Sequence, residues 1–108
     1  MENEYSFEKD LKFIERELIA RQINGKYIKF NKDINAVAIL NMTKYEYLDY
    51  WSKQYEDNIE KMEKIIEICN DKFENNLVSR EEMIELVLNS KDNTKDKPEA
   101  LRLLGYKI

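Results

Sequence analysis

Several residue types are scarce or missing in this 108-residue chain, which has no histidine, one cysteine, two glycines and one proline. Without histidine it lacks the commonest general base near neutral pH, so Ser-His-Asp and Cys-His catalysis are excluded, together with histidine-containing zinc sites. Cys69 alone cannot form an internal disulfide, and we interpret it as a buried apolar residue. Two glycines are too few for a glycine-rich phosphate loop. We therefore expect no cofactor, and an enzyme is the least expected class of protein.

Long apolar runs are also missing. No run approaches the roughly 18 residues of a membrane span, and no charged-then-apolar leader opens the chain. We therefore expect a cytoplasmic protein with no membrane partner. The scarcity of glycine and proline disfavours a β-sandwich or barrel, which needs many tight turns. The charged share of 37% is well above that of ordinary proteins, and with this length it indicates one solvated, helix-rich domain over residues 1–108.

The apolar spacing in the first 40 residues predicts a helix followed by a β-hairpin. Steps of three and four predict a helix over residues 6–23, through Phe7, Leu11, Ile14 and Leu18. Two short runs rich in β-branched and aromatic residues then predict a hairpin over residues 26–40. In its first strand, we expect one face to pack on helices, while the face that carries Tyr27 and Lys29 meets water.

The segment from residue 44 to residue 74 is predicted to form one helix of about 30 residues. Thr43 with Glu46 fits a capping box, and no glycine or proline interrupts the segment. Its apolar residues recur at steps of three and four: Leu48, Trp51, Tyr55, Ile59, Met62, Ile66, Cys69 and Phe73. At 1.5 Å per residue this helix is ~45 Å long, whereas a compact domain of this size is about 33 Å across. One end should therefore project, and its apolar stripe would be covered by the C-terminal helices or by a second chain in a homodimer.

Two shorter helices are predicted in the last third of the chain. Ser79 with Glu82 forms a second capping box, which predicts a helix over residues 80–90. Residues 97–104 form a last short helix. The overall expectation is an α+β fold, predominantly helical, in the order helix, hairpin, long helix and two short helices.

The aromatic residues of the long helix divide into core and surface. Trp51 and Tyr55 lie on the apolar stripe, and Tyr47 lies at its edge, where a tyrosine can bury its ring and hydrate its hydroxyl. Tyr50 points about 140° away from the stripe. Because exposed tyrosines favour binding surfaces, Tyr47 and Tyr50 are candidate anchors for a protein partner. The alternative is that another helix of the same chain covers Tyr50.

Acidic side chains dominate residues 45–76, which carry nine acidic and four basic residues. Four glutamates fall within an arc of about 60° on one flank of the predicted helix: Glu56, Glu60, Glu63 and Glu67. They are candidates for contact with a basic protein surface. The simpler alternative is a solvated face, because favourable i,i+4 pairs such as Glu60–Lys64 explain part of the charge.

Basic side chains instead concentrate in residues 21–44, which carry five lysines or arginines and one aspartate. With one tyrosine among them they could contact phosphates and stack on a base, and the candidates are Arg21, Lys26, Tyr27, Lys29, Lys32 and Lys44. However, lysines also protect exposed strand edges, and the flanking acidic helices would repel a polyanion. A nucleic-acid-binding or transcription-regulatory module is therefore the alternative reading.

We expect a small, non-enzymatic intracellular interaction protein that binds and blocks or regulates another macromolecule. Lysine, asparagine and isoleucine, which are encoded by AT-rich codons, are abundant and suggest a low-GC bacterium or its phage. Compact acidic proteins of such sources often inhibit proteins with basic sites. The sharpest hypotheses are an anti-CRISPR or anti-restriction type of inhibitor of a nucleic-acid-handling enzyme, and a toxin immunity protein.

Overall fold

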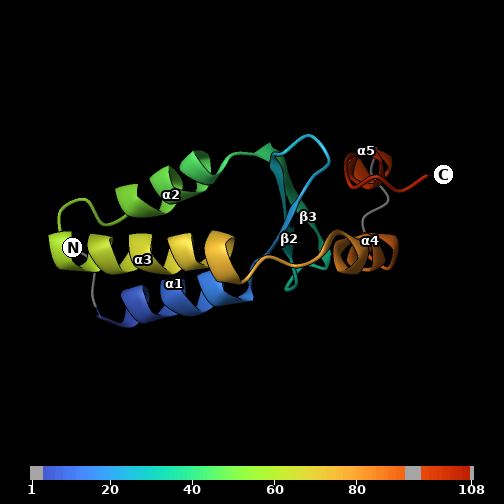
Figure 1. The fold of residues 1–108 in the computed structure, drawn as a ribbon. Coiled ribbons are helices and arrows are strands. Elements are labelled where there is room, and N and C mark those ends of the chain that lie inside the picture. Colours follow the sequence, from blue (N-terminus) through green and yellow to red (C-terminus); the bar gives the residue numbers. More distant parts are fainter. Residues whose placement is uncertain (1–3, 92–95, 108) are drawn as a thin grey trace.

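A three-stranded antiparallel sheet lies between two layers of helices in the computed structural model, which describes residues 4–91 and 96–107 (Figure 1). Three helices cover one side of the sheet and two cover the other. The elements in chain order are α1 (Glu4–Arg16), β1 (Leu18–Arg21), β2 (Tyr27–Asn31), β3 (Ala36–Met42), α2 (Lys44–Lys53), α3 (Ile59–Asn75), α4 (Arg80–Leu88) and α5 (Asp96–Leu103). The predicted combination of a hairpin with several helices, including the two short C-terminal ones, is confirmed.

The first helix is shorter than predicted, because residues 18–21 form a strand instead of continuing the helix. β1 pairs antiparallel with β2, so that Ala20 lies opposite Ile28. Lys72 of α3 helps to end α1, since its ammonium group donates to the backbone carbonyl of Glu17 at 2.6 Å and satisfies an acceptor at the C-terminus of the helix. The prediction of one helix over residues 6–23 was therefore wrong beyond Arg16.

Helices cover both faces of β2, whereas the sequence predicted one face in contact with water. Ile28 and Phe30 pack on α4 and α5 in one apolar cluster. On the opposite face, Tyr27 packs against a second cluster formed mainly by α1, α2 and α3. The prediction that Tyr27 and Lys29 face water was wrong because the helix layer covers their face as well. The strands lie between the two clusters (Figure 1).

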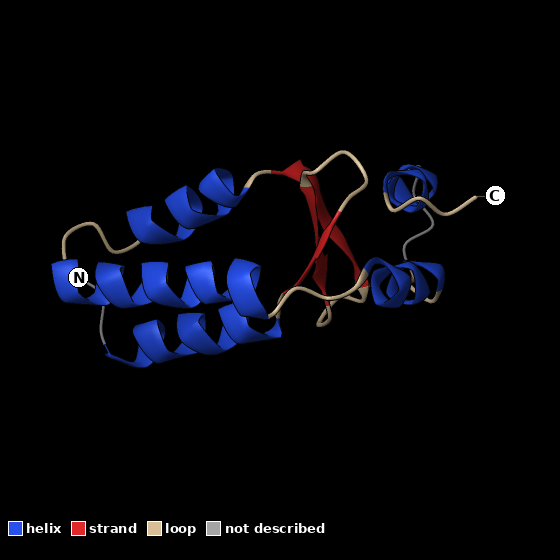
Figure 2. Ribbon diagram, in the orientation of Figure 1, coloured by secondary structure: helices blue, strands red, loops and turns tan. Residues whose placement is uncertain are grey.

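The predicted 30-residue helix is two helices joined by residues 54–58 and packed side by side in opposite directions (Figure 2). Asn58 starts the second helix, since its side-chain oxygen accepts from the backbone N–H of Lys61 at 3.2 Å. Ile59, which was predicted to lie on the apolar stripe, is 66% exposed. The prediction of a single helix over residues 44–74 was therefore wrong.

Because α2 folds back on α3, the argument that one end of a long helix projects no longer applies. Trp51 and Tyr55 now pack in the same cluster as Ile65, Cys69 and Phe73 of α3. Most of the apolar stripe is thus covered within one chain, so a projecting helix no longer supports the predicted homodimer, which stays a prediction. The capping box of Thr43 is confirmed: its hydroxyl accepts from the N–H of Glu46 at 3.0 Å, and the Glu46 carboxylate accepts from the N–H of Thr43 at 2.8 Å.

Candidate functional site

The aromatic residues of α2 divide differently from the sequence prediction. Trp51 and Tyr55 are buried, as expected, and Tyr50 is 58% exposed. Tyr47, however, is only 2% exposed. A partner can reach Tyr50 but not Tyr47, so Tyr47 is withdrawn as a candidate anchor.

Tyr47 belongs to a buried polar cluster centred on Glu17. Its hydroxyl donates to Glu17 Oε1 at 2.6 Å, and Lys29 Nζ lies 2.8 Å from Glu17 Oε2. Burial, together with the negative charge of Glu17, raises the pKa of Tyr47 well above its ordinary value. Both oxygens of this carboxylate are thus partnered, which is what a charge buried this deeply requires. Lys29 is held inside the protein by this ion pair and is not available to a phosphate.

The six basic-segment candidates do not form one surface. Lys29 points inward, and the ring of Tyr27 packs edge-on against Phe73 with centroids 4.8 Å apart. Lys32 lies in the β2–β3 turn, whereas Lys26 lies at the opposite end of β2, beside the β1–β2 turn that Arg21 precedes. The remaining residue, Lys44, approaches the carboxylate of Glu74 at 3.9 Å.

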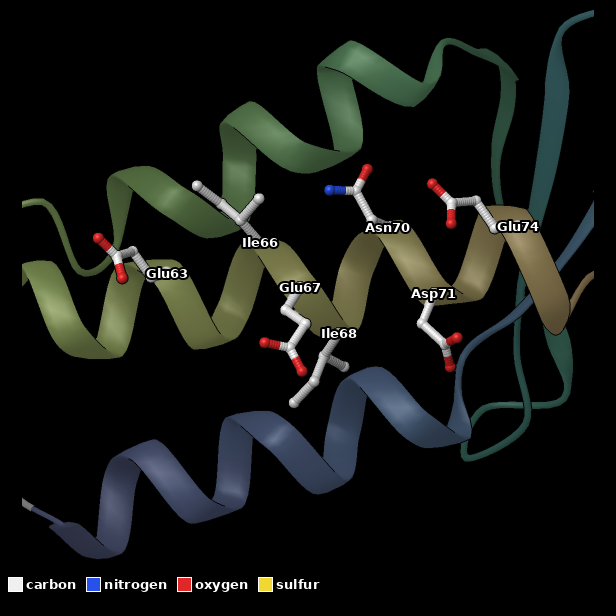
Figure 3. Close-up of a pocket in the computed structure, with 7 residues that line it drawn as sticks. All are labelled: Glu63, Ile66, Glu67, Ile68, Asn70, Asp71 and Glu74. Atoms are coloured by element: carbon white, nitrogen blue, oxygen red, sulfur yellow. The ribbon is translucent and has the colours of Figure 1, made fainter.

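The acidic candidates, in contrast, extend into a longer row on α3. Glu60, Glu63 and Glu67 are exposed on this helix, while Glu56 lies just before it in the connection. An open hollow of about 580 Å³ follows the helix (Figure 3) and is lined by Glu63, Ile66, Glu67, Ile68, Asn70, Asp71 and Glu74. We define the acidic face as Glu60, Glu63, Glu67, Asp71 and Glu74. Sequence analysis missed the last two, although they continue the same spacing of three and four.

Few of these carboxylates are neutralised within the protein. Across residues 4–91 and 96–107, no lysine or arginine nitrogen is found within 4 Å of the carboxylates of Glu63 or Glu67. Glu74 has only the long, exposed contact with Lys44, and such contacts contribute little. Asp71 accepts from the side-chain amides of Asn75 and Asn76, which are neutral. The face therefore presents mostly uncompensated negative charge.

The chemistry open to this face is electrostatic. In the described part of the chain, no group of three or more histidine, cysteine, aspartate or glutamate side chains is arranged to hold a metal ion.

The Cys69 thiol lies in the core, where burial raises its pKa to about 12, so it is almost entirely protonated near neutral pH.

Tyr50 lies on α2, whereas the acidic face lies on α3. Its ring lies edge-on against Trp51 with centroids 5.3 Å apart. Trp51 lines a hollow of about 330 Å³ whose other lining residues all come from α1: Lys9, Asp10, Lys12, Phe13 and Arg16. The exposed tyrosine and the acidic candidates thus come from two different helices.

Comparisons with known proteins found no relative of this chain. None of the protein families, curated proteins or solved structures with which the chain was compared matches it. Among the described residues, no helix combines the length and the apolar character needed to cross a bilayer.

Proposed function

We propose that this chain is a protein-binding module whose acidic face on α3 docks on a basic surface of another macromolecule and thereby blocks or regulates it. The observation that supports this proposal best is the row of like charges along one exposed helix face, with Glu63 and Glu67 lacking an ion-pair partner among the described residues.

This row costs stability in the free protein. Successive carboxylates are three or four positions apart, which brings them close together on the helix, and each such like-charged pair destabilises a helix by about 0.2–0.5 kcal/mol. The four pairs between Glu60 and Glu74 together cost roughly 1–2 kcal/mol. A basic partner would remove that repulsion. The carboxylates that favour binding therefore lower the stability of the free protein.

The charge spacing fits a partner that normally binds nucleic acid. From Glu60 to Glu74 the helix rises about 21 Å, so its five carboxylates follow one another at intervals of about 5 Å. A single nucleic-acid strand carries one phosphate per ~3.4 Å, which is within a factor of two. We therefore favour an inhibitor that occupies the basic site of a nucleic-acid-handling enzyme, as an anti-CRISPR or anti-restriction protein would, over an immunity protein for another kind of toxin.

Charge reversal on the acidic face tests this function. The wild type and the variant E63K/E67K are immobilised, exposed to extract of the source cell, and the retained proteins are identified. The variant should lose basic, nucleic-acid-binding proteins that the wild type retains, and rising salt should release them from the wild type. The matched control E8K/E85K changes the net charge equally at exposed positions of α1 and α4 and should retain them.

Two outcomes would contradict the proposal. The first is retention of the same proteins by E63K/E67K and by the wild type. The second is loss of binding in K26E/K32E while E63K/E67K still binds, which would favour the nucleic-acid-binding alternative at the hairpin.

A further inference from the structure

Three side-chain amides join the β1–β2 turn to the end of β3. Gln22 Nε2 donates to Asn24 Oδ1 at 2.9 Å and to Asn41 Oδ1 at 2.8 Å. Asn24 Nδ2 donates to the same Asn41 oxygen at 2.9 Å. Gln22 is only 1% exposed, so its amide needs these partners in place of water. We call Gln22, Asn24 and Asn41 the amide triad.

Backbone N–H groups fix the orientation of each amide in the triad. The N–H of Asn41 donates to Gln22 Oε1 at 2.9 Å, so the NH2 group of Gln22 faces the other two amides. The N–H of Lys26 donates to Asn24 Oδ1 at 3.0 Å, which leaves the NH2 group of Asn24 for Asn41. Asn41 must therefore present its oxygen to both NH2 groups. None of the three amides can turn over without bringing two donors or two acceptors together.

Asn24 precedes Gly25, and together they form the only Asn-Gly pair in the chain. The turn requires this glycine, because its φ is +86°. In an Asn-Gly pair the backbone nitrogen of glycine can attack the side-chain carbonyl carbon of asparagine, since glycine has no side chain to hinder ring closure. The Gly25 nitrogen loses its proton and bonds to Asn24 Cγ, while the Cγ–Nδ2 bond breaks and ammonia leaves. Water then opens the cyclic imide to aspartate or isoaspartate.

In the folded turn, each polar group that this reaction uses is already hydrogen-bonded. The N–H of Gly25 donates to the carbonyl of Gln22 at 3.1 Å. The leaving nitrogen, Asn24 Nδ2, donates to Asn41, and Asn24 Oδ1 accepts from Gln22 and Lys26. Because these bonds must break before the ring closes, the reaction should proceed from an open form of the turn.

We propose that Asn24 is a deamidation site that the amide triad protects and whose product the triad cannot accommodate. Deamidation replaces Nδ2 by a carboxylate oxygen, so that this oxygen and Asn41 Oδ1, both acceptors, face each other. If Asn41 turned over, its NH2 group would face Gln22 Nε2, whose orientation is fixed. The modified turn should therefore close less readily, at the end of the sheet where Tyr27 pairs with Met42. This site includes no residue of the acidic face and does not depend on the proposed function.

The rate of deamidation tests the protection. The protein is incubated in warm, mildly alkaline buffer, and modified Asn24 is measured by peptide mapping with mass spectrometry. The chain unfolded in guanidinium chloride should react faster than the folded chain. Asn41→Gly removes the partner of Asn24 Nδ2, and glycine tolerates the φ of 58° at this position. Given the net contribution of one hydrogen bond, the folded variant should deamidate roughly two- to tenfold faster than the folded wild type. The matched control Asn35→Gly, at another asparagine with positive φ, should leave the rate unchanged.

The stability of the product tests whether the triad accommodates it. Asn24→Asp reproduces one product of the reaction and should lower the midpoint of urea unfolding. The loss should be smaller in the Asn41→Gly background, where no side-chain oxygen at position 41 faces the new carboxylate. The difference between the two losses measures the interaction between positions 24 and 41.

Three results would overturn the proposal. They are equal rates of Asn24 deamidation in the folded and the unfolded chain, no acceleration in Asn41→Gly, and the same loss from Asn24→Asp in both backgrounds.

Discussion

Replacing Glu67 by glutamine should stabilise the protein. Glu67 stands in the middle of the acidic face, with Glu63 four residues before it and Asp71 four residues after it. Glutamine has nearly the same helix propensity and shape as glutamate, so the substitution removes the charge and little else. The side chain is exposed and has no ion-pair partner among the described residues.

The expected magnitude follows from the two like-charged pairs that disappear. Each costs about 0.2–0.5 kcal/mol, so the free energy of unfolding should rise by about 0.4–1.0 kcal/mol at low salt. For a domain of this size, that corresponds to an increase in Tm of roughly 2–6 °C. In 1 M salt the Debye length falls to about 3 Å, and most of the gain should disappear.

The assay is urea unfolding followed by the fluorescence of Trp51, the only tryptophan of the chain. A matched control on the same helix is Glu60→Gln, which should have the opposite sign. Glu60 lies in the first turn of α3, where a negative charge interacts favourably with the helix dipole by about 0.3–1 kcal/mol. It also stands four residues before Lys64 in the favourable order.

If Glu67→Gln lowers stability, or if both variants shift it equally in the same direction, the carboxylates of α3 do not repel one another as supposed. The energetic argument for a binding face would then be withdrawn. A gain that persists unchanged in 1 M salt would also count against an electrostatic cause.

Three further predictions concern the interior and the helix ends. Lys29→Met leaves the Glu17 carboxylate buried without its cation, so it should lower the free energy of unfolding by about 3–5 kcal/mol in urea titrations. A loss below ~1 kcal/mol would mean that water reaches the carboxylate. Asn58→Ala removes the N-terminal cap of α3 and should cost about 1 kcal/mol, whereas a gain in helical circular dichroism would show that residues 54–58 can join α2 to α3. Because burial raises the pKa of Cys69 to about 12 from its ordinary 9.0, the unfolded chain releases this proton first and stability should fall as the pH rises from 9 to 12. The difference between wild type and Cys69→Ala isolates this slope from that of Lys72, whose pKa burial lowers, and an identical pH dependence in the two proteins would contradict the assignment.

Local signals in the sequence predicted the element types well where capping and spacing decide them. Thr43 forms the predicted capping box with Glu46, and Ser79 acts as the N-cap of α4 by accepting from the backbone N–H of Glu82. The strand over residues 18–21 could not be predicted in this way, because consecutive apolar residues fit the end of an amphipathic helix as well as a strand buried on both faces. Pairing with β2, which is a contact distant in sequence, decides between the two.

The sequence contains one signal of the break in the predicted long helix, but the regular apolar spacing conceals it. Tyr55 and Ile59 keep the apolar period across the connection, so the stripe appears continuous, although Tyr55 is buried and Ile59 is exposed. Asp57-Asn58 is a poor pair for a helix interior and a good one for a helix start. Reading Asn58 as a cap would have predicted two helices without any tertiary information.

The candidate site was predicted in part for the same reason. The spacing of acidic residues within α3 is a local property, so Glu60, Glu63 and Glu67 emerged from the sequence. Burial of Tyr47 and Lys29 depends on Glu17, which lies 30 residues before the tyrosine in the chain. No periodicity within α2 or β2 contains that partner.

The sheet separates two independent sets of apolar contacts, and this arrangement affects how a disturbance spreads. Val87 and Leu101 pack on one side of the strands, while Trp51 and Phe73 pack on the other. If α4 and α5 loosened, Ile28 and Phe30 would become exposed to solvent, whereas the apolar cluster formed mainly by α1, α2 and α3 would stay buried. Damage to either layer would thus stop at the sheet, and we expect the amide hydrogens of β2, which pairs with a strand on each side, to be the last in the molecule to exchange with water.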